Sequence, residues 1–341
     1  MKAMILEKFH DLCRTSHPLK LTEYPTPVPQ KGQVLIKVSA CGVCHTEIDV
    51  IEGRTSPRLP VVPGHQVIGQ IVDRGPEVTA YKTGDRVGVA WIFWACGKCD
   101  YCLSDQENLC SQFVGTGCHA DGGYAEYMVA NEGFIHPIPE LFSDAQAAPL
   151  LCAGAIGYRS LHLTGIADGQ LLGLAGFGAS AHLVIKMVAF RFPNTRVFVY
   201  ARSQKERAFA RELGAFWTGD FNASPPEPLD TVIDTTPAWK PVLKALEILK
   251  PGGRLVINAI RKEDTDRDLL NSVDYARHLW LEKEIKTVAN VTCSDVADFL
   301  KLAAEIAIEP VVKEYCLEDA NRALMELKTR KIHGAKVLCM K

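Results

Sequence analysis

The sequence has almost no net charge and lacks a long apolar run. Its 341 residues contain 38 lysines and arginines against 40 aspartates and glutamates, a net charge of -2. Without an excess of positive charge, binding to the phosphates of nucleic acid has little support. No stretch approaches the roughly 18 apolar residues that a membrane-spanning helix needs. The start of the chain, Met1 to Lys8, is charged within a few residues and has no apolar secretory segment. We therefore expect a cytoplasmic protein that binds neither membranes nor nucleic acid.

Internal repeats and low-complexity tracts are also missing, and the length suits two domains of about 100–200 residues each. The N-terminal part contains short runs of branched apolar residues, such as 34–38 and 67–72, separated by glycine and proline. This pattern is typical of antiparallel strands and barrels.

From about Asp168 the pattern changes, and strands alternate with helices. A buried strand is predicted at 171–174 and further strands at 196–200, 231–234, 255–257 and 285–288. Helices are predicted at 179–190, 204–213 and 240–249, with a turn at 251–253. Such alternation predicts a parallel, doubly wound sheet. A last helix at 318–328 and a short strand at 336–338 are expected to return to the first domain.

The chain is rich in cysteine, with twelve residues. Four of them, Cys96, Cys99, Cys102 and Cys110, follow the spacing C-x2-C-x2-C-x7-C. Four thiolates this close in sequence can surround one tetrahedral Zn²⁺ at ~2.3 Å and leave no position for a substrate, which predicts a structural zinc. An iron–sulfur cluster and unliganded thiols are the alternatives. Five other cysteines stand singly and are expected to be small buried residues: Cys13, Cys118, Cys293, Cys316 and Cys339.

A second metal site is indicated by Cys44, His65 and Cys152. Two thiolates and an imidazole match the catalytic type of zinc site, which keeps a fourth position open. Each residue alone is a weak signal, because Cys41 and Cys44 could form a redox pair and a single histidine is commonly a hydrogen-bonded core residue.

Taken together, the motifs resemble those of the medium-chain, zinc-dependent alcohol dehydrogenase family. They comprise C-G-V-C-H-T at 41–46, G-H at 64–65, the four-cysteine lobe at about 93–112, G-G-Y-A-E-Y at 122–127 and L-C-A-G at 151–154. The resemblance spans essentially the whole chain. It implies a GroES-like β-rich catalytic domain (1–153 and 291–341) and a Rossmann domain (154–290). It also implies Cys44, His65 and Cys152 as ligands of the catalytic zinc, with Cys41 a bystander.

The resemblance assigns roles to the residues around this zinc. The metal acts as a Lewis acid on an alcohol or aldehyde oxygen, and the nicotinamide ring accepts the hydride. Thr46 matches the hydroxyl that relays the alcohol proton, and Glu47 matches an acid that steadies His65. His45 matches a position near the cofactor pyrophosphate.

Several positions differ from the family pattern. Gln66 replaces a common glutamate, and Asp49 replaces the histidine that ends the proton relay, where it could still accept a proton. Ile156 replaces a threonine that contacts the nicotinamide. Trp91 aligns with an aromatic residue of the substrate pocket and favours small primary alcohols, unless it is simply a core residue.

A dinucleotide fingerprint follows the first strand of the second domain. Gly173, Ala175, Gly176, Phe177 and Gly178 fit G-x-A-G-x-G, and the frame G-x-G-x-x-A at 176–181 fits equally well. In either frame the glycines permit a tight turn, and the following helix presents N–H groups to the pyrophosphate. The Cβ of Ala175 is expected to lie near the phosphates and loosen the contact.

The second strand of this domain lacks the acid that binds the ribose 2′-hydroxyl of NAD. Ala201 stands at that position, followed by Arg202, Ser203 and Lys205. Arginine can pair with a 2′-phosphate through two hydrogen bonds, so NADP is preferred over NAD. Alternatively, Arg202 is solvated or stacks on adenine, and NAD binding is retained.

The sequence therefore predicts a zinc-dependent alcohol dehydrogenase or aldehyde reductase for small primary substrates, with two zinc ions per chain. A cinnamyl- or polyol-type dehydrogenase with a wider pocket is the nearest alternative. A non-catalytic relative that keeps zinc as a scaffold or redox module is the alternative from another class. Relatives of this length suggest a homodimer or homotetramer.

Overall fold

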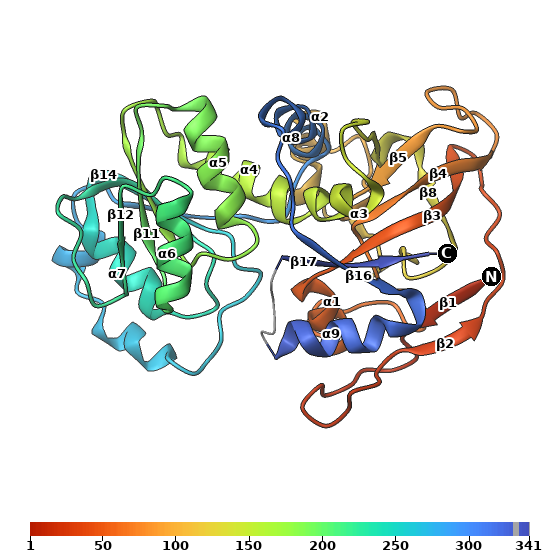
Figure 1. The fold of residues 1–341 in the computed structure, drawn as a ribbon, viewed down its shortest axis with the longest axis horizontal. Helices are drawn as coiled ribbons and strands as arrows, with labels where there is room; N and C mark the ends of the chain where they lie inside the picture. The colour runs from red at the N-terminus through yellow and green to blue at the C-terminus, as the bar shows by residue number, and fades with distance from the viewer. Residues whose placement is uncertain (330–333, 341) are drawn as a thin grey trace. The chain divides into compact units, whose positions relative to one another are not determined.

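The computed structural model describes residues 1–329 and 334–340. The chain forms two compact units (Figure 1). Unit 1 contains Met1–Cys152 and Val291–Lys341, and unit 2 contains Ala153–Asn290. Unit 1 is therefore assembled from the two ends of the chain. Its first segment ends at Cys152, one residue before the end of the range 1–153 expected from the sequence.

Unit 1 is built around a seven-stranded sheet in which β3 (Gln33–Val43) is central. The strand order is β16-β17-β3-β4-β5-β9, and β8 also pairs with β3. The other strands are β4 (Val67–Arg74), β5 (Arg86–Val89), β8 (Tyr127–Asn131), β9 (Ile135–Pro137), β16 (Val312–Cys316) and β17 (Ala335–Cys339). Only β16 and β17 pair in parallel; the β3, β4, β5, β8 and β9 pairings are antiparallel, as the short apolar runs predicted.

Smaller elements complete unit 1. Two small antiparallel sheets of two strands each are present. One pairs β1 (Lys2–Ile5) with β2 (Lys20–Glu23), and the other pairs β6 (Ile92–Trp94) with β7 (Val114–Gly115). The helices are α1 (His45–Ile51), α2 (Asp100–Leu103), α3 (Asp144–Ala147), α8 (Cys293–Ile306) and α9 (Ala320–Lys328). The sequence interpretation missed α8, although Thr292 and Asp295 form a capping box at its start.

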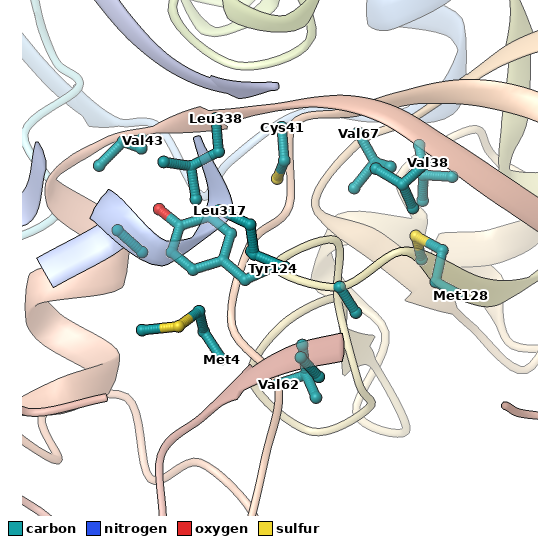
Figure 2. Packing of buried hydrophobic residues seen from close by; sticks show 14 of the residues in the cluster. Met4, Val38, Cys41, Val43, Val62, Val67, Tyr124, Met128, Leu317 and Leu338 are labelled. Carbon is teal, nitrogen blue, oxygen red and sulfur yellow. The ribbon is translucent and has the colours of Figure 1, made fainter. Parts of the chain in front are cut away.

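The core of unit 1 joins segments that are far apart in sequence. Figure 2 shows the ring of Tyr124 among Met4, Cys41, Leu317 and Leu338. Because these side chains come from both ends of the chain, burial of their apolar surface holds the C-terminal segment to the N-terminal sheet. The helix expected at 318–328 and the strand expected at 336–338 correspond to α9 and β17, and both belong to unit 1.

Unit 2 is a six-stranded, fully parallel sheet with the order β12-β11-β10-β13-β14-β15. This is the Rossmann order, 3-2-1-4-5-6. The strands are β10 (Leu171–Ala175), β11 (Arg196–Tyr200), β12 (Trp217–Gly219), β13 (Leu229–Asp234), β14 (Leu249–Ile257) and β15 (Glu284–Thr287). The predicted strands are confirmed, but β14 begins earlier than expected and includes the supposed turn at 251–253.

Helices cover both faces of this sheet. They are α4 (Ala153–Thr164), α5 (Ala181–Arg191), α6 (Gln204–Glu212) and α7 (Lys240–Ile248). Phe198 and Tyr200 share a core cluster with residues of α7. Side chains alternate along a strand, so the equally buried Val197 and Val199 point to the opposite face.

Short helical turns complete the described chain. They are η1 (Glu107–Leu109), η2 (Glu132–Phe134), η3 (Ala148–Leu151), η4 (Arg267–Ser272), η5 (Tyr275–Leu279) and η6 (Leu317–Asp319). Among the described residues, no helix is both long enough and apolar enough to cross a membrane.

Candidate active site and metal centres

The four cysteines of the lobe converge between β6 and β7. Their sulfur atoms all lie within 4.8 Å of one another. Cys102 Sγ is 3.6 Å from Cys99 Sγ and 3.9 Å from Cys96 Sγ. Sulfurs at 2.3 Å around one tetrahedral zinc are separated by about 3.8 Å. An iron–sulfur cluster spreads its four cysteines around several iron atoms, so these short separations fit a single ion.

The backbone prepares part of this centre for a cation. N–H groups of Lys98 and Cys99 lower the pKa of Cys96 to about 6. The N–H of Gln112 also donates to Cys110 Sγ at 3.4 Å. Donors aimed at sulfur stabilise the thiolate, which is the form that binds a metal.

Cys44, His65 and Cys152 come together from three separate segments of unit 1. Cys44 follows β3 and caps α1, His65 precedes β4, and Cys152 follows η3. Cys44 Sγ lies 3.7 Å from His65 Nε2 and 3.9 Å from Cys152 Sγ. These distances suit three ligands on one tetrahedral ion. Three protein ligands leave the fourth position for another molecule, in contrast to the closed four-cysteine site.

Glu47 organises this centre. One carboxylate oxygen lies 2.5 Å from His65 Nδ1, and the other accepts a hydrogen bond from the Cys44 backbone N–H at 2.8 Å. His65 and Glu47 are each only 1% exposed. Burial alone would lower the pKa of His65, but its interactions with the Glu47 carboxylate and with Cys44 outweigh burial and raise this pKa to about 10. The imidazole ring is thus held in a strongly cation-favouring environment, with Nε2 turned toward the thiols.

The environment of the Cys44 thiol also favours a bound metal ion. The neighbouring Cys152 thiol and burial raise the pKa of Cys44 well above its ordinary value. The Cys44 thiol therefore keeps its proton more firmly when no cation is present, whereas binding of a divalent ion releases it. The N–H of Thr46 donates to Cys44 Sγ at 3.3 Å. The donor set therefore fits zinc.

The other predicted residues of unit 1 lie around this centre or next to it in sequence. Trp91 packs edge-on against His65, with ring centroids 5.3 Å apart. Thr46 is nearly buried, and His45 is exposed at the start of α1. Asp49 is buried and forms a 2.7 Å ion pair with Arg54, a partner that the sequence interpretation missed.

Cys41 and Gln66 are buried close to the ligands in sequence. Cys41 is fully buried in the core of unit 1, and Gln66 packs against the Gly42 backbone. A Cβ at position 42 would lie 2.7 Å from Gln66 Oε1. A larger residue at position 42 would therefore displace the Gln66 side chain.

The nucleotide fingerprint forms the expected turn between β10 and α5. Gly176 has φ +85°, a backbone conformation that favours glycine. A Cβ on Gly178 would meet no atom within 4 Å, whereas one on Gly173 would strike Leu229 and Val232. Gly173 thus allows β10 to pack closely against side chains of β13. Space for another group next to the turn lies at Gly178.

Two expectations about this turn need correction or refinement. Ala175 is buried, and its Cβ belongs to the apolar core of unit 2, so it does not face the turn as expected. Its Cβ points inward because side chains alternate along β10. Phe177 is also buried and packs edge-on against Phe209 of α6.

The segment after β11 carries the residues predicted for the 2′-position. Ala201 is buried, whereas Arg202, Ser203 and Lys205 are exposed. The Ser203 hydroxyl caps α6 by accepting from the Glu206 N–H at 3.1 Å. Arg207 was missed by the sequence interpretation. Its Nη1 donates to the carbonyl oxygens of Ala201 (2.7 Å) and Arg202 (2.9 Å) and so fixes this loop.

Metal content can separate the two centres. We expect purified protein to contain two zinc ions per chain, one for each ligand group. Cys152→Ser should reduce the content to one and abolish activity without unfolding the chain. Cys102→Ser should lose the other ion and also lower the melting temperature, because structural zinc contributes directly to folding. Atomic emission on gel-filtered protein and thermal melts measure both effects; a Cys152→Ser variant that retains two ions would contradict the assignment.

Comparison with known proteins agrees with this geometry. Residues 30–140 match the alcohol dehydrogenase GroES-like domain. The chain is 41% identical to probable alcohol dehydrogenase AdhA of Mycobacterium tuberculosis, covering 94% of this chain and 92% of the relative. It is 30% identical to an alcohol dehydrogenase of Geobacillus stearothermophilus, covering 99% of each.

A solved structure extends the likeness to the fold. Cinnamyl alcohol dehydrogenase SbCAD4 of Sorghum bicolor superposes with a TM-score of 0.83 at 26% identity, covering 99% of this chain and 97% of the other. The sequence match, the fold and the two cysteine-containing centres agree. The chain is thus an oxidoreductase that belongs to the medium-chain, zinc-dependent alcohol dehydrogenase family.

Proposed function

We propose that this alcohol dehydrogenase interconverts small primary alcohols and aldehydes and prefers NADP(H) over NAD(H), which makes aldehyde reduction its working direction. The observation that carries the cofactor preference is the end of β11. The buried Ala201 takes the place of the acid that would bind a ribose 2′-hydroxyl. The exposed Arg202 directly follows, where a 2′-phosphate would find a guanidinium.

The loop after β11 is suited to hold an anion. Arg207 occupies the carbonyl oxygens of Ala201 and Arg202. These oxygens would otherwise present negative dipoles beside a phosphate. The N-terminus of α6 begins at the same loop and adds a favourable dipole. Ser203 and Lys205 supply further polar groups.

In the reaction, Cys44, His65 and Cys152 would hold the catalytic zinc. When bound, zinc supplies a Lewis acid for the substrate oxygen, and the nicotinamide supplies or accepts the hydride. Glu47 keeps His65 oriented through its 2.5 Å contact with Nδ1. Thr46 is proposed to relay the alcohol proton. Asp49, which lies 2.7 Å from Arg54 in an ion pair, is proposed to receive it.

Substrate size is proposed to depend on Trp91. Its indole packs on His65 and stacks on Phe113, with ring centroids 6.1 Å apart. A bulky ring fixed from two sides narrows the space beside the metal ligands, which favours small substrates. The sorghum relative, named as a cinnamyl alcohol dehydrogenase, keeps a bulkier substrate as the alternative.

We also propose a homodimer or homotetramer in the cytoplasm. Every residue of β15 is exposed, and this strand forms one edge of the unit 2 sheet. Exposed apolar side chains lie on and close to it, including Tyr275, Trp280, Leu281 and Ile285. An exposed edge strand with several exposed apolar side chains on it or shortly before it in sequence favours association with a second copy. A reducing cytoplasm suits a chain that places six cysteines in candidate metal centres.

A rate matrix tests the proposed activity. Initial rates with NADP and NAD should be compared for ethanol through benzyl alcohol, and with NADPH and NADH for the matching aldehydes. We expect the largest kcat/KM for a small aldehyde with NADPH. A clear preference for cinnamyl-type aldehydes would favour the wider-pocket alternative, and no turnover by zinc-replete protein would contradict the proposal.

Arg202→Asp tests the cofactor preference. Loss of a charge-assisted pair with the 2′-phosphate, combined with repulsion from the new carboxylate, should raise KM for NADPH by about 10- to 100-fold. KM for NADH should stay similar or fall, since an acid can bind the 2′-hydroxyl. Arg211→Asp, the same charge change at an exposed arginine in the last turn of α6, serves as a matched control. Equal changes for both cofactors in Arg202→Asp would show that Arg202 does not read the 2′-position.

Ile285→Lys tests the oligomer. A charge placed on β15 should shift the mass measured by light scattering toward the monomer, because it introduces an uncompensated charge into an apolar interface. Phe216→Lys, a similar change at an exposed site elsewhere on unit 2, serves as the control. A wild-type chain that is monomeric at micromolar concentration would overturn the oligomer proposal.

A further inference from the structure

A buried lysine of unit 2 lies behind the glycine turn and has no part in the activity described so far. Lys262 follows β14, and its ammonium group contacts Asp234 at the end of β13. The side chains are 10% and 0% exposed. Lys262 Nζ also donates to the carbonyl oxygens of Thr236 at 2.7 Å and Ala238 at 3.1 Å. A single ammonium thus binds three acceptors within residues 234–238.

Asp234 extends this cluster toward the backbone. Its Oδ1 accepts hydrogen bonds from the Thr236 N–H at 3.0 Å and the Thr236 hydroxyl at 2.8 Å. The Glu263 N–H donates to the Pro237 oxygen at 2.6 Å, which adds a direct link between the two segments. The loops that follow β13 and β14 are therefore held together by Lys262 and Asp234.

The loop after β13 in turn supports the glycine turn. The Thr235 N–H and hydroxyl both donate to the Ala175 carbonyl oxygen, at 2.9 and 3.1 Å. A Cβ at Gly176 would lie 2.7 Å from Thr235 Oγ1 and 2.9 Å from Thr236 Cγ2. Thr235 and Thr236 therefore pack against the Gly176 turn, where φ is positive. Lys262 fixes Thr236 by donating to its carbonyl oxygen.

We propose that Lys262 is a positioning residue for the dinucleotide cofactor, acting through Asp234 and residues 235–238 on the Gly176 turn. A buried carboxylate needs a partner. Without the ammonium, Asp234 must take up a proton or the loop must open to water, and either change releases Thr236. The turn whose N–H groups receive the pyrophosphate then loses its support. The proposal rests on the enzyme using a nicotinamide dinucleotide, but not on its preference for NADP.

A second lysine–aspartate pair offers a matched control at the opposite end of β13. Lys250 Nζ lies 2.9 and 2.8 Å from the two carboxylate oxygens of Asp230, and Asp230 also accepts from the Leu171 N–H at 2.7 Å. This ion pair likewise joins β13, β14 and β10. Because it lies at the amino end of the parallel strands, it cannot support the turn at their carboxyl end.

The test compares Lys262→Met, the double variant Asp234→Asn with Lys262→Met, and Lys250→Met. Fluorescence titration of the holoenzyme gives Kd for NADPH and NADH, and circular dichroism gives Tm. We expect both Lys262 variants to raise both Kd values by the same factor, on the order of tenfold, since small displacements of binding groups have effects of this size. Lys250→Met should lower Tm but change Kd by less than about twofold.

The double variant keeps the test decisive if Lys262→Met fails to fold. It removes the charge that would be left unpaired and also the ammonium that ties Thr236 and Ala238. A folded double variant with unchanged Kd would reduce Lys262 to a stabilising residue and overturn the proposal. A loss confined to NADPH would also overturn it, because the turn contacts the part shared by both cofactors. An equal loss of affinity for NADPH and NADH in the Lys262 variants supports the positioning role of Lys262, whatever the result for Arg202→Asp. The positioning role and the proposed preference for NADP can therefore fail independently of each other.

Discussion

The centre formed by Cys44, His65 and Cys152 depends on one buried carboxylate. Glu47 contacts His65 Nδ1 and the Cys44 backbone at the same time, and so joins the end of β3 to the segment before β4. Without this anion, the imidazole ring would be free to rotate and the loop carrying Cys44 would lose its anchor. The arrangement stays favourable because each oxygen of the buried carboxylate has a hydrogen-bond partner. Three distant segments can then present sulfur and nitrogen at distances that one small cation can satisfy.

The two cysteine-containing centres differ in how they are assembled, and this difference determines their chemistry. The lobe draws all four ligands from Cys96 to Cys110, with N–H groups of the same short segment directed at sulfur. It can form locally, and it saturates the metal. The other centre needs the ends of β3, β4 and η3 to meet, so it exists only once the sheet has folded. Three ligands then leave room for a reacting molecule.

In unit 2 the corresponding question is what fixes the conformation of the glycine turn between β10 and α5. Glycine permits the positive φ at position 176 but does not select it, since its backbone is the most flexible of all residues. The selection comes from neighbouring loops that pack against the turn and from the buried charges that hold those loops. Charged groups placed behind a binding loop, and not in it, can therefore control how well the loop is preorganised.

The sequence by itself determined the features that depend on short-range spacing and periodicity. The cysteine spacing of the lobe, the glycine fingerprint and the alternation of strands and helices are local patterns, and the structure contains each of them. The family motifs also located Cys44, His65 and Cys152 because their order along the chain is characteristic. The orientation of Ala175, the partners of Asp49 and Asp234 and the supporting role of Arg207 were decided only by tertiary structure. Each depends on which way a side chain points and on what lies across from it after folding. Such information is spread over residues distant in sequence and leaves no periodic signal.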